Sequence, residues 1–466
     1  MTKGAPVPET WDYEADIIVV GAGTAGFPAA IVAADAGAKV VLLELLPMTA
    51  PSLGLINVGP AFAGTDVQKE LGIEDSPEEY YKDGVELAHG DPELWRVFAD
   101  NQLDTYYWCQ EIGMNFGKDL FPPPGHRIKR GIWKKGTEMT RALEKTAKAK
   151  ENIDIKFSHR ATRLITDPDT GRVLGLKVKV KDAEQNFKAK KAVILATGGF
   201  GRNKEMVEEY GPYFKDWLPT MCQGHHGDGL KMSLDLGAAT KHLGRAVSGS
   251  FAVDIETKSG IMDFIGYSGG IYVNIYGKRF EDESGRVRFY GLVTETGMKQ
   301  PERIWFGIID DKIKNTTLRP HMLKKAKPVQ ADSIEELAKK LEIDPVGLKE
   351  TLAKYNGDLE TVGYDTVFDR RSQEGCEGKP ITIDTPPFYA YKCTGATSSF
   401  KGGLKINGKS QALTQYDEVI PSLYASGELT GGMWGDDGTY LPCTMVTMAM
   451  TFGRIAAKHA VAESSW

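Results

Sequence analysis

The chain has 466 residues, of which 41% are hydrophobic and 26% are charged. These values are typical of a globular protein with a large core, and the length allows two or three domains. The net charge of −6 argues against a nucleic-acid-binding surface, and no apolar run is long enough to predict membrane insertion. The five cysteines form no Cys-x-x-Cys pair, so we expect reduced thiols, a cytoplasmic location and no metal site.

The segment from residue 16 to residue 44 has the pattern of a dinucleotide-binding unit. Residues 17–20 and 39–43 predict two buried parallel strands, and the Ala-rich residues 25–36 predict a helix between them. The sequence GAGTAG at residues 21–26 supplies glycines for a tight turn, for close approach of a pyrophosphate and for close packing of helix and strand. Glu44 ends the second strand at the distance where an acid binds an adenosine ribose. We therefore expect a dinucleotide, with its pyrophosphate at the helix N-terminus.

The elements after residue 44 predict a discontinuous α/β protein. Strands are expected at 153–158, at 161–167 and 173–181 as a β-meander, and at 191–196, where Thr197-Gly198-Gly199 lets the backbone approach a cofactor. Helices are expected at 80–87, 92–113, 137–150 and 444–462, with Ser76 and Glu79 forming a capping box before the first of them. Residues 245–384 mix alternating stretches with helices at 333–341 and 346–356, which predicts an inserted α+β cap.

Two polar segments have ordinary interpretations. The basic residues 126–135 are expected to form a solvated face of the protein. His225 and His226 lie in GHHGDG, and no set of carboxylates accompanies them, so a turn near the cofactor is favoured over a metal site.

Together these segments resemble the flavoprotein family of soluble fumarate reductases, succinate dehydrogenase flavoprotein subunits and 3-ketosteroid dehydrogenases. The resemblance covers nearly the whole chain. It is carried by VVGAGTAG (19–26), QKELGIEDSP (68–77), ATGGF (196–200), GDG (227–229), VNIYGKRF (273–280) and LYASGELTGG (423–432). It implies a Rossmann-like (GR2-type) FAD-binding domain in two parts, residues 1–244 and 385–466, and a substrate-binding cap at residues 245–384.

The family resemblance implies FAD, with Glu428 near its ribityl or pyrophosphate part and the last helix directed at the flavin pyrimidine. A helix N-terminus there would stabilise the negative charge of reduced flavin. Residues 49–59 lack the histidine that tethers FAD in membrane-complex members, so we expect non-covalent FAD. The expected FAD-binding residues are Gly21, Ala22, Gly23, Thr24, Ala25, Gly26, Glu44, Leu45, Ser52, Leu53, Ala161, Ala196, Thr197, Gly198, Asp228, Gly427, Glu428, Thr444, Met445 and Val446.

The chain departs from fumarate reductases where those enzymes hold a dicarboxylate. Ser399 replaces the histidine of the His-Thr-x-Gly-Gly motif, and Ser250 lies near the place of the second histidine. Val287 stands where the proton-donating arginine is expected, and the upstream relay is reduced to Asp263 and Gly266. Without these residues the charge clamp and the acid are both missing, so fumarate reduction is not the expected activity.

The C-terminal stretch GTYLPCT at residues 438–444 instead resembles the ketosteroid dehydrogenases. There a tyrosine, here Tyr440, and a backbone N–H, here of Cys443 or Thr444, hydrogen-bond the ketone of the substrate. A base must then remove the α-proton, and a phenol serves only if neighbours hold its phenolate. Tyr290, with Arg288 nearby, is the expected base, and Tyr267 is the reserve candidate.

The leading hypothesis is an FAD-dependent oxidoreductase acting on the Cα–Cβ bond next to a ketone. It would desaturate a cyclic ketone of the 3-ketosteroid or cyclohexanone type, or reduce the enone, with hydride passing between Cβ and flavin N5. Its partners would be this small-molecule substrate and an external electron acceptor or donor of unknown identity. One alternative is a fumarate- or urocanate-type reductase in which Arg286 or Arg288 serves as the acid. Another is a flavin electron-transfer subunit without a substrate of its own.

Overall fold

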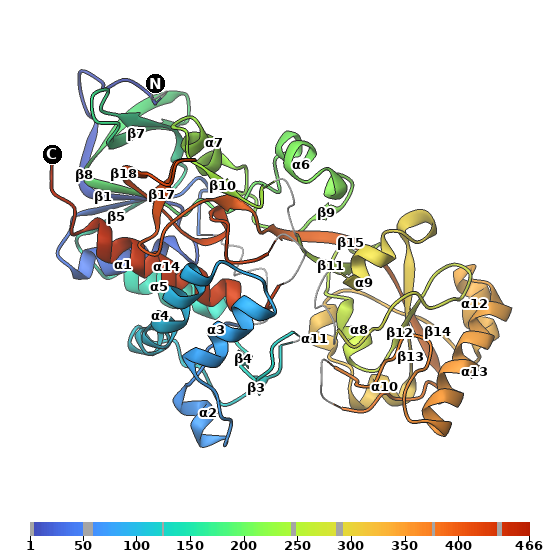
Figure 1. Cartoon of the computed structure of the whole chain (residues 1–466). Coiled ribbons are helices and arrows are strands. Elements are labelled where there is room, and N and C mark those ends of the chain that lie inside the picture. Colours follow the sequence, from blue (N-terminus) through green and yellow to red (C-terminus); the bar gives the residue numbers. More distant parts are fainter. Residues whose placement is uncertain are drawn as a thin grey trace.

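The structure is a computed structural model that describes residues 4–49, 59–123, 125–243, 248–285, 292–374, 378–435 and 440–466. Figure 1 shows two lobes, a larger one that carries both termini and a smaller one that carries α8 to α13. Within the described ranges, no helix is long and apolar enough to cross a bilayer.

The larger lobe is built on an eight-stranded sheet with the order β17-β18-β8-β1-β2-β5, to which β6 and β7 add through β8. The strands are β1 (Tyr13–Val20), β2 (Val40–Leu43), β5 (Ile153–Lys156), β6 (Arg160–Thr166), β7 (Val173–Val180), β8 (Ala183–Leu195), β17 (Gln411–Leu413) and β18 (Val419–Ala425). Strand β1 is parallel to both neighbours, with Val20 opposite Leu43 and Leu195. The carboxyl ends of these strands therefore meet at one edge, where α/β proteins bind their ligands.

Helices cover this sheet and bring the end of the chain back to its beginning. Helix α14 lies beside α1 below the sheet (Figure 1), and a Cβ at Gly453 would collide with the backbone of Ala25, so glycine permits this close contact. The helices of this lobe are α1 (Gly26–Asp35), α2 (Asp66–Glu70), α3 (Pro77–Glu86), α4 (Pro92–Glu111), α5 (Gly136–Lys148), α6 (Lys204–Tyr210), α7 (Asp228–Leu234) and α14 (Thr444–Ala460). Two short ladders, β3 (Leu120–Phe121) with β4 (Gly131–Ile132) and β10 (Thr240–Lys241) with β16 (Gly403–Leu404), complete it.

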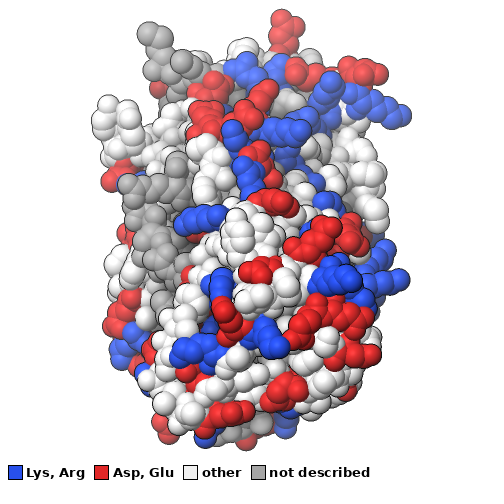
Figure 2. Space-filling view, turned by 90° about the vertical axis from the view of Figure 1, so that its right-hand side faces the viewer, with Lys and Arg blue, Asp and Glu red and all other residues white. Residues whose placement is uncertain are grey.

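The smaller lobe contains a six-stranded sheet with the order β11-β15-β13-β12, in which β14 and β9 also pair with β15. Its strands are β9 (Leu218–Pro219), β11 (Ser248–Asp254), β12 (Ile271–Val273), β13 (Trp305–Asp310), β14 (Val329–Ala331) and β15 (Phe388–Phe400). Its helices are α8 (Asp263–Tyr267), α9 (Leu292–Gly297), α10 (Asp311–Thr316), α11 (Pro320–Leu323), α12 (Ile334–Leu341) and α13 (Pro345–Thr361). Strand β15 begins after residue 384 and yet is central to this sheet, and the domain limits at 245 and 385 stay a prediction. On the face in Figure 2, acidic and basic side chains are interspersed rather than gathered by sign.

The α/β class is confirmed, and β6, β7 and β8 form the expected meander. Two local predictions are wrong. Ser76 accepts the N–H of Glu79 at 3.2 Å, but the Glu79 carboxylate pairs with Lys82 at 2.7 Å instead of closing a capping box. The basic segment 126–135 is not a solvated face, because Arg130 is fully buried between the carboxylates of Asp75 and Asp83. These partners lie 55 and 47 residues away, so the local pattern could not reveal them.

Candidate functional site

A cavity of about 470 Å³ opens at the carboxyl edge of the large sheet and extends to the smaller lobe. We call it the central cavity. Its lining comes from the turns after β1, β2 and β8, the turn Gly427–Leu429, the start of α14 and segments of β11 and β15. The predicted residues that line it are Gly21, Ala22, Gly23, Thr24, Ala25, Glu44, Leu45, Ala161, Ala196, Thr197, Gly198, Asp228, Gly427, Glu428, Tyr440, Met445 and Val446.

The turn after β1 has the tight geometry that its glycines predict. Gly21 has φ +108°, and a Cβ there would collide with the carbonyl oxygen of Ala196. A Cβ at Gly26 would collide with the carbonyl oxygen of Gly21. Gly26 itself does not line the central cavity, so it holds the helix against the turn and is not placed to touch a ligand.

Two acids lie at the end of the central cavity that the turn after β1 (residues 21–26) forms, which we call the glycine end. Glu44 accepts the backbone N–H groups of Ala22 at 2.9 Å and Leu46 at 2.8 Å, which fixes its carboxylate beside the turn. Burial raises the pKa of Glu44. Asp228 forms a two-pronged ion pair with Arg160, with both N–O distances 2.8 Å. Glu44 thus lies beside the glycine turn, and its ribose-binding role stays a prediction.

The donor set of the glycine end fits a dinucleotide cofactor. The Thr197 hydroxyl is buried at the wall and has no hydrogen-bond partner within the part of the chain that the structure describes. A buried hydroxyl without a partner costs free energy unless a ligand supplies one. A Cβ at Gly198 would collide with the imidazole ring of His225, so the backbone of Gly198 packs directly against that side chain. Bare backbone and one orphaned donor suit the pyrophosphate and ribityl parts of FAD.

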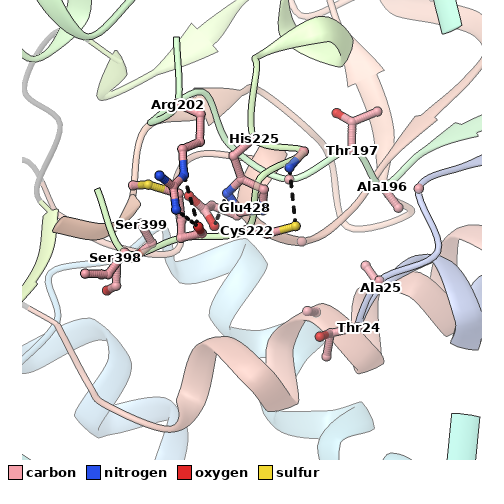
Figure 3. A pocket seen from close by; sticks show the side chains of 18 of the residues that line it. Thr24, Ala25, Ala196, Thr197, Arg202, Cys222, His225, Ser398, Ser399 and Glu428 are labelled. Atoms are coloured by element: carbon pink, nitrogen blue, oxygen red, sulfur yellow. Dashed lines mark hydrogen bonds and ion pairs between the residues drawn. The ribbon is translucent and has the colours of Figure 1, made fainter. Parts of the chain in front are cut away.

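Glu428 and His225 form a neutral pair in the wall (Figure 3). The Glu428 carboxyl accepts the N–H of Phe400 at 3.0 Å, and its other oxygen lies 3.5 Å from His225 Nδ1. Burial raises the pKa of Glu428 to about 8 and lowers that of His225 to about 4. At neutral pH the Glu428 carboxyl therefore keeps its proton and the His225 imidazole is uncharged. His225 lies beside the cofactor wall, as GHHGDG predicts, and within the described ranges no cluster of acids, histidines and cysteines could hold a metal.

Tyr440, Ser398 and Ser399 line the other end of the central cavity, which we call the tyrosine end. In Figure 3, Ser398 and Ser399 lie across the cavity from Thr24 and Ala196. The Tyr440 ring packs edge to face against Trp434, with 4.8 Å between the ring centroids. Burial raises the pKa of Tyr440, so its phenol keeps its proton at neutral pH and acts as a donor. The apolar side chains in this wall are Phe251, Val253 and Ile261 from the smaller lobe, with Met445 and Val446 from α14.

The turn that carries Tyr440 is held by buried hydrogen bonds. His126 Nε2 lies 2.9 Å from the carbonyl oxygen of Pro442, and the Thr444 hydroxyl lies 2.8 Å from that of Tyr80. Cys443 ends the turn with φ +67°, a strained value for a side chain with a Cβ. Neither Cys443 nor Thr444 lines the central cavity, whereas Met445 and Val446 do. The role of the Cys443 or Thr444 N–H as a donor to the substrate stays a prediction.

The catalytic candidates divide into three groups. Tyr440 lines the central cavity. Tyr267 is buried behind the wall in a cluster with Ile261, Phe264 and Met322, and it does not line the cavity. Arg288 and Tyr290, like Ser52 and Leu53, lie outside the described residues. Single charged or hydroxyl residues form no motif, so several polar side chains that line the cavity were not predicted from the sequence, among them Arg202, Lys258, Lys324 and Ser398.

Comparison with known proteins agrees with this geometry. The family described as FAD binding domain matches residues 16–437. The chain is 31% identical to a fumarate reductase (cytochrome) of Shewanella frigidimarina, over 96% of this chain and 77% of that protein. Its structure resembles the open conformation of a flavocytochrome c3 fumarate reductase, with a TM-score of 0.82, 29% identity and coverage of 97% and 79% of the two chains. It also resembles 3-ketosteroid-Δ4-(5α)-dehydrogenase of Rhodococcus jostii RHA1, with a TM-score of 0.78, 25% identity and coverage of 97% and 98%. The chain therefore belongs to the FAD-binding flavoprotein family of the fumarate reductases, and it is an FAD-dependent oxidoreductase.

Proposed function

We propose that this flavoprotein adds or removes hydrogen across the Cα–Cβ bond next to a ketone of a cyclic substrate. The observation that carries the proposal is Tyr440, a protonated phenol that lines the central cavity together with the apolar side chains of Phe251, Val253 and Ile261. A phenol O–H can donate to a carbonyl oxygen and stabilise the negative charge that develops there. One such donor is typically worth about 2.7–4 kcal/mol in the transition state.

The chain's own residues divide the remaining work. The start of α14, at Met445 and Val446, supplies a positive helix end beside the cavity. Phe251, Val253 and Ile261 exclude water and would contact the ring of the substrate. Bound FAD supplies hydride transfer, and we propose that it is held without a covalent bond. Tyr290 stays the proposed base for the α-proton, with Tyr267 in reserve.

A reductase of an unsaturated acid is the second candidate. The relative with 31% identity is named fumarate reductase, and two lysines of the smaller lobe, Lys258 and Lys324, line the central cavity. These lysines could bind a carboxylate, although the sequence lacks the histidines expected of a fumarate site. A flavin electron carrier is the third candidate, and it would have no use for the tyrosine end of the cavity.

Anaerobic photoreduction of the FAD-loaded protein separates these candidates. We expect a cyclic enone such as cyclohexenone or a 3-keto-Δ4-steroid to reoxidise the flavin rapidly, as followed by the return of its visible absorbance. Fumarate should reoxidise it no faster than buffer. Reoxidation by fumarate and by no enone would reject the ketone hypothesis in favour of the second candidate, and no response to either would favour the third.

Two further properties stay predictions of the same proposal. Release of yellow FAD into the supernatant on acid precipitation would support non-covalent binding, and flavin that stays with the pellet would contradict it. We also propose the cytoplasmic location that the scattered cysteines of the sequence predict.

A further inference from the structure

Lys401 is a buried lysine next to the tyrosine end of the central cavity, in the segment that follows β15. The residue is 3% exposed, and its Nζ has no hydrogen-bond partner within the part of the chain that the structure describes. Natural proteins rarely bury a lysine in this way, and each case calls for a physical explanation.

The backbone around Lys401 fixes its position. A Cβ at Gly402 would collide with the carbonyl oxygen of His242, and a Cβ at Gly403 would collide with that of Leu429. The two glycines thus allow the chain to pass tightly between two other segments. The backbone next to Lys401 is therefore held in place by these two segments.

The only aromatic faces near the Lys401 amine, among the described residues, are those of Tyr440 and Trp434. Its Nζ lies 3.1 Å from the centroid of the Tyr440 ring and 5.8 Å from that of Trp434. Tyr440 lines the central cavity and Lys401 does not, so the amine contacts the ring from behind the wall. A cation over the face of a phenol ring is attracted by the ring electrons.

We propose that Lys401 is a positioning residue for Tyr440, whose amine, when charged, strengthens the hydrogen bond that Tyr440 donates to a substrate carbonyl oxygen. This inference rests on the proposed function. As negative charge develops on the carbonyl, the phenol shares its proton and its ring becomes richer in electrons. The attraction between ring and ammonium then grows, so Lys401 stabilises the transition state more than the ground state.

The charges that face Lys401 bear on this role. Burial lowers the pKa of Lys401 well below its usual range, while the charge of Glu295 on α9 favours its charged form. Glu428 adds to this effect only when it is ionised, which burial opposes at neutral pH. Tyr440 is the titratable group in direct contact with it. Negative charge that develops at the tyrosine end is attracted by the amine when it is already charged, so the effect of Lys401 depends on its protonation before the reaction.

The test compares Lys401→Met with Lys401→Arg in the FAD-loaded enzyme, with the enone as substrate. Methionine matches the volume of lysine without a charge, and we expect kcat to fall about 10- to 100-fold with KM changed less than about threefold. Arginine stays charged at all accessible pH values and should restore part of kcat. In the wild type, kcat should fall as pH rises through the pKa of Lys401, and this limb should be absent in Lys401→Met. Lys405→Met, which removes a surface lysine paired with Asp417, is the matched control and should behave as wild type.

A second measurement does not depend on turnover. A free lysine titrates near 10.4, so a buried one with a lowered pKa makes the wild type more stable, relative to Lys401→Met, as pH rises between the two values. A Tm difference that does not change with pH would overturn the buried-amine assignment. Wild-type kcat in Lys401→Met would overturn the role of Lys401 alone. Failure of the wild type to turn over any enone or ketone would overturn the proposed function, and this role with it.

Discussion

The two ends of the central cavity are built by different means. At the glycine end, the wall at Gly21 and Gly198 is backbone, because a Cβ there would collide with Ala196 and His225, and Glu44 is held by backbone N–H groups. At the tyrosine end, the wall is made of side chains from both lobes, among them Phe251, Ser399 and Tyr440.

This difference separates cofactor binding from substrate choice. A wall made of backbone needs small residues at fixed spacing, so its sequence tolerates little change. This wall binds the part of FAD that is common to the family. Side chains that meet from distant segments can be exchanged one at a time. Relatives that share the glycine end can therefore differ in the substrate they reduce or oxidise.

The largest effect is expected from Gly21→Ala, which tests whether the glycine end is rigid. The methyl group would collide with the carbonyl of Ala196, and φ +108° is unfavourable for alanine. We expect a loss of roughly 3 kcal/mol or more in the free energy of unfolding and little bound flavin. The measurements are the Tm and the ratio of flavin to protein absorbance after purification.

Gly37→Ala is the control, because Gly37 also has positive φ but nothing lies within 4 Å of its Cβ position. Its cost should be only about 1 kcal/mol, from the left-handed backbone alone, with full flavin content. Equal losses in the two variants would show that collision with the β8 turn does not define the wall at the glycine end.

The next effect in size is expected from Tyr440→Phe, which tests whether the hydroxyl at the tyrosine end takes part in catalysis. Removal of the hydroxyl should lower kcat for enone reduction about 10²- to 10³-fold, with FAD content unchanged, because the carbonyl loses its donor. The measurements are steady-state kinetics and flavin absorbance.

Two other tyrosines calibrate this result. Tyr416→Phe alters a surface side chain that is 76% exposed and should be neutral. Tyr267→Phe should change kcat less than about threefold, since Tyr267 does not line the cavity. A hundredfold loss in Tyr267→Phe would make it the base, and wild-type turnover in Tyr440→Phe would remove Tyr440 from the mechanism.

The same contrast explains what the sequence could predict. Strand β1, the GAGTAG turn and α1 follow one another within 23 residues, and local propensity and spacing specify all three. The family resemblance predicts Glu428 and Tyr440 near the cofactor, and both line the central cavity.

Contacts between distant segments were not predictable. The local sequence SFKGG at residues 399–403 does not show that the amine of Lys401 lies over the ring of Tyr440. The two residues are 39 positions apart and no periodicity links them. The burial of Arg130 is unpredictable for the same reason. A basic local composition predicts exposure to solvent, and the acids that pair with Arg130 lie in distant segments.

The smallest effect is expected from Asp263→Asn. This variant tests whether a buried carboxyl group in the smaller lobe keeps its proton, whereas Glu44 is held as a carboxylate by backbone N–H groups. Asp263 on α8 is buried, accepts the N–H of Ala252 at 2.7 Å, and has a pKa raised by burial to about 7. The native state thus binds a proton more tightly than the unfolded chain, whose aspartate titrates near 4. Wild-type stability should therefore fall as pH rises from about 4 through 7, by roughly 1–3 kcal/mol.

Asparagine keeps the acceptor for Ala252 and does not titrate, so the Tm of Asp263→Asn relative to wild type should rise across this pH range and level off above it. Thr294→Val is the control, because it removes the 3.4 Å contact to Asp263 and leaves the carboxyl group in place. Its pH trend should follow the wild type. A Tm difference between Asp263→Asn and wild type that is equal at pH 5 and pH 8 would mean that Asp263 is ionised in the folded protein. The substrate side would then hold its buried acid as the cofactor side holds Glu44, by hydrogen bonds to a carboxylate.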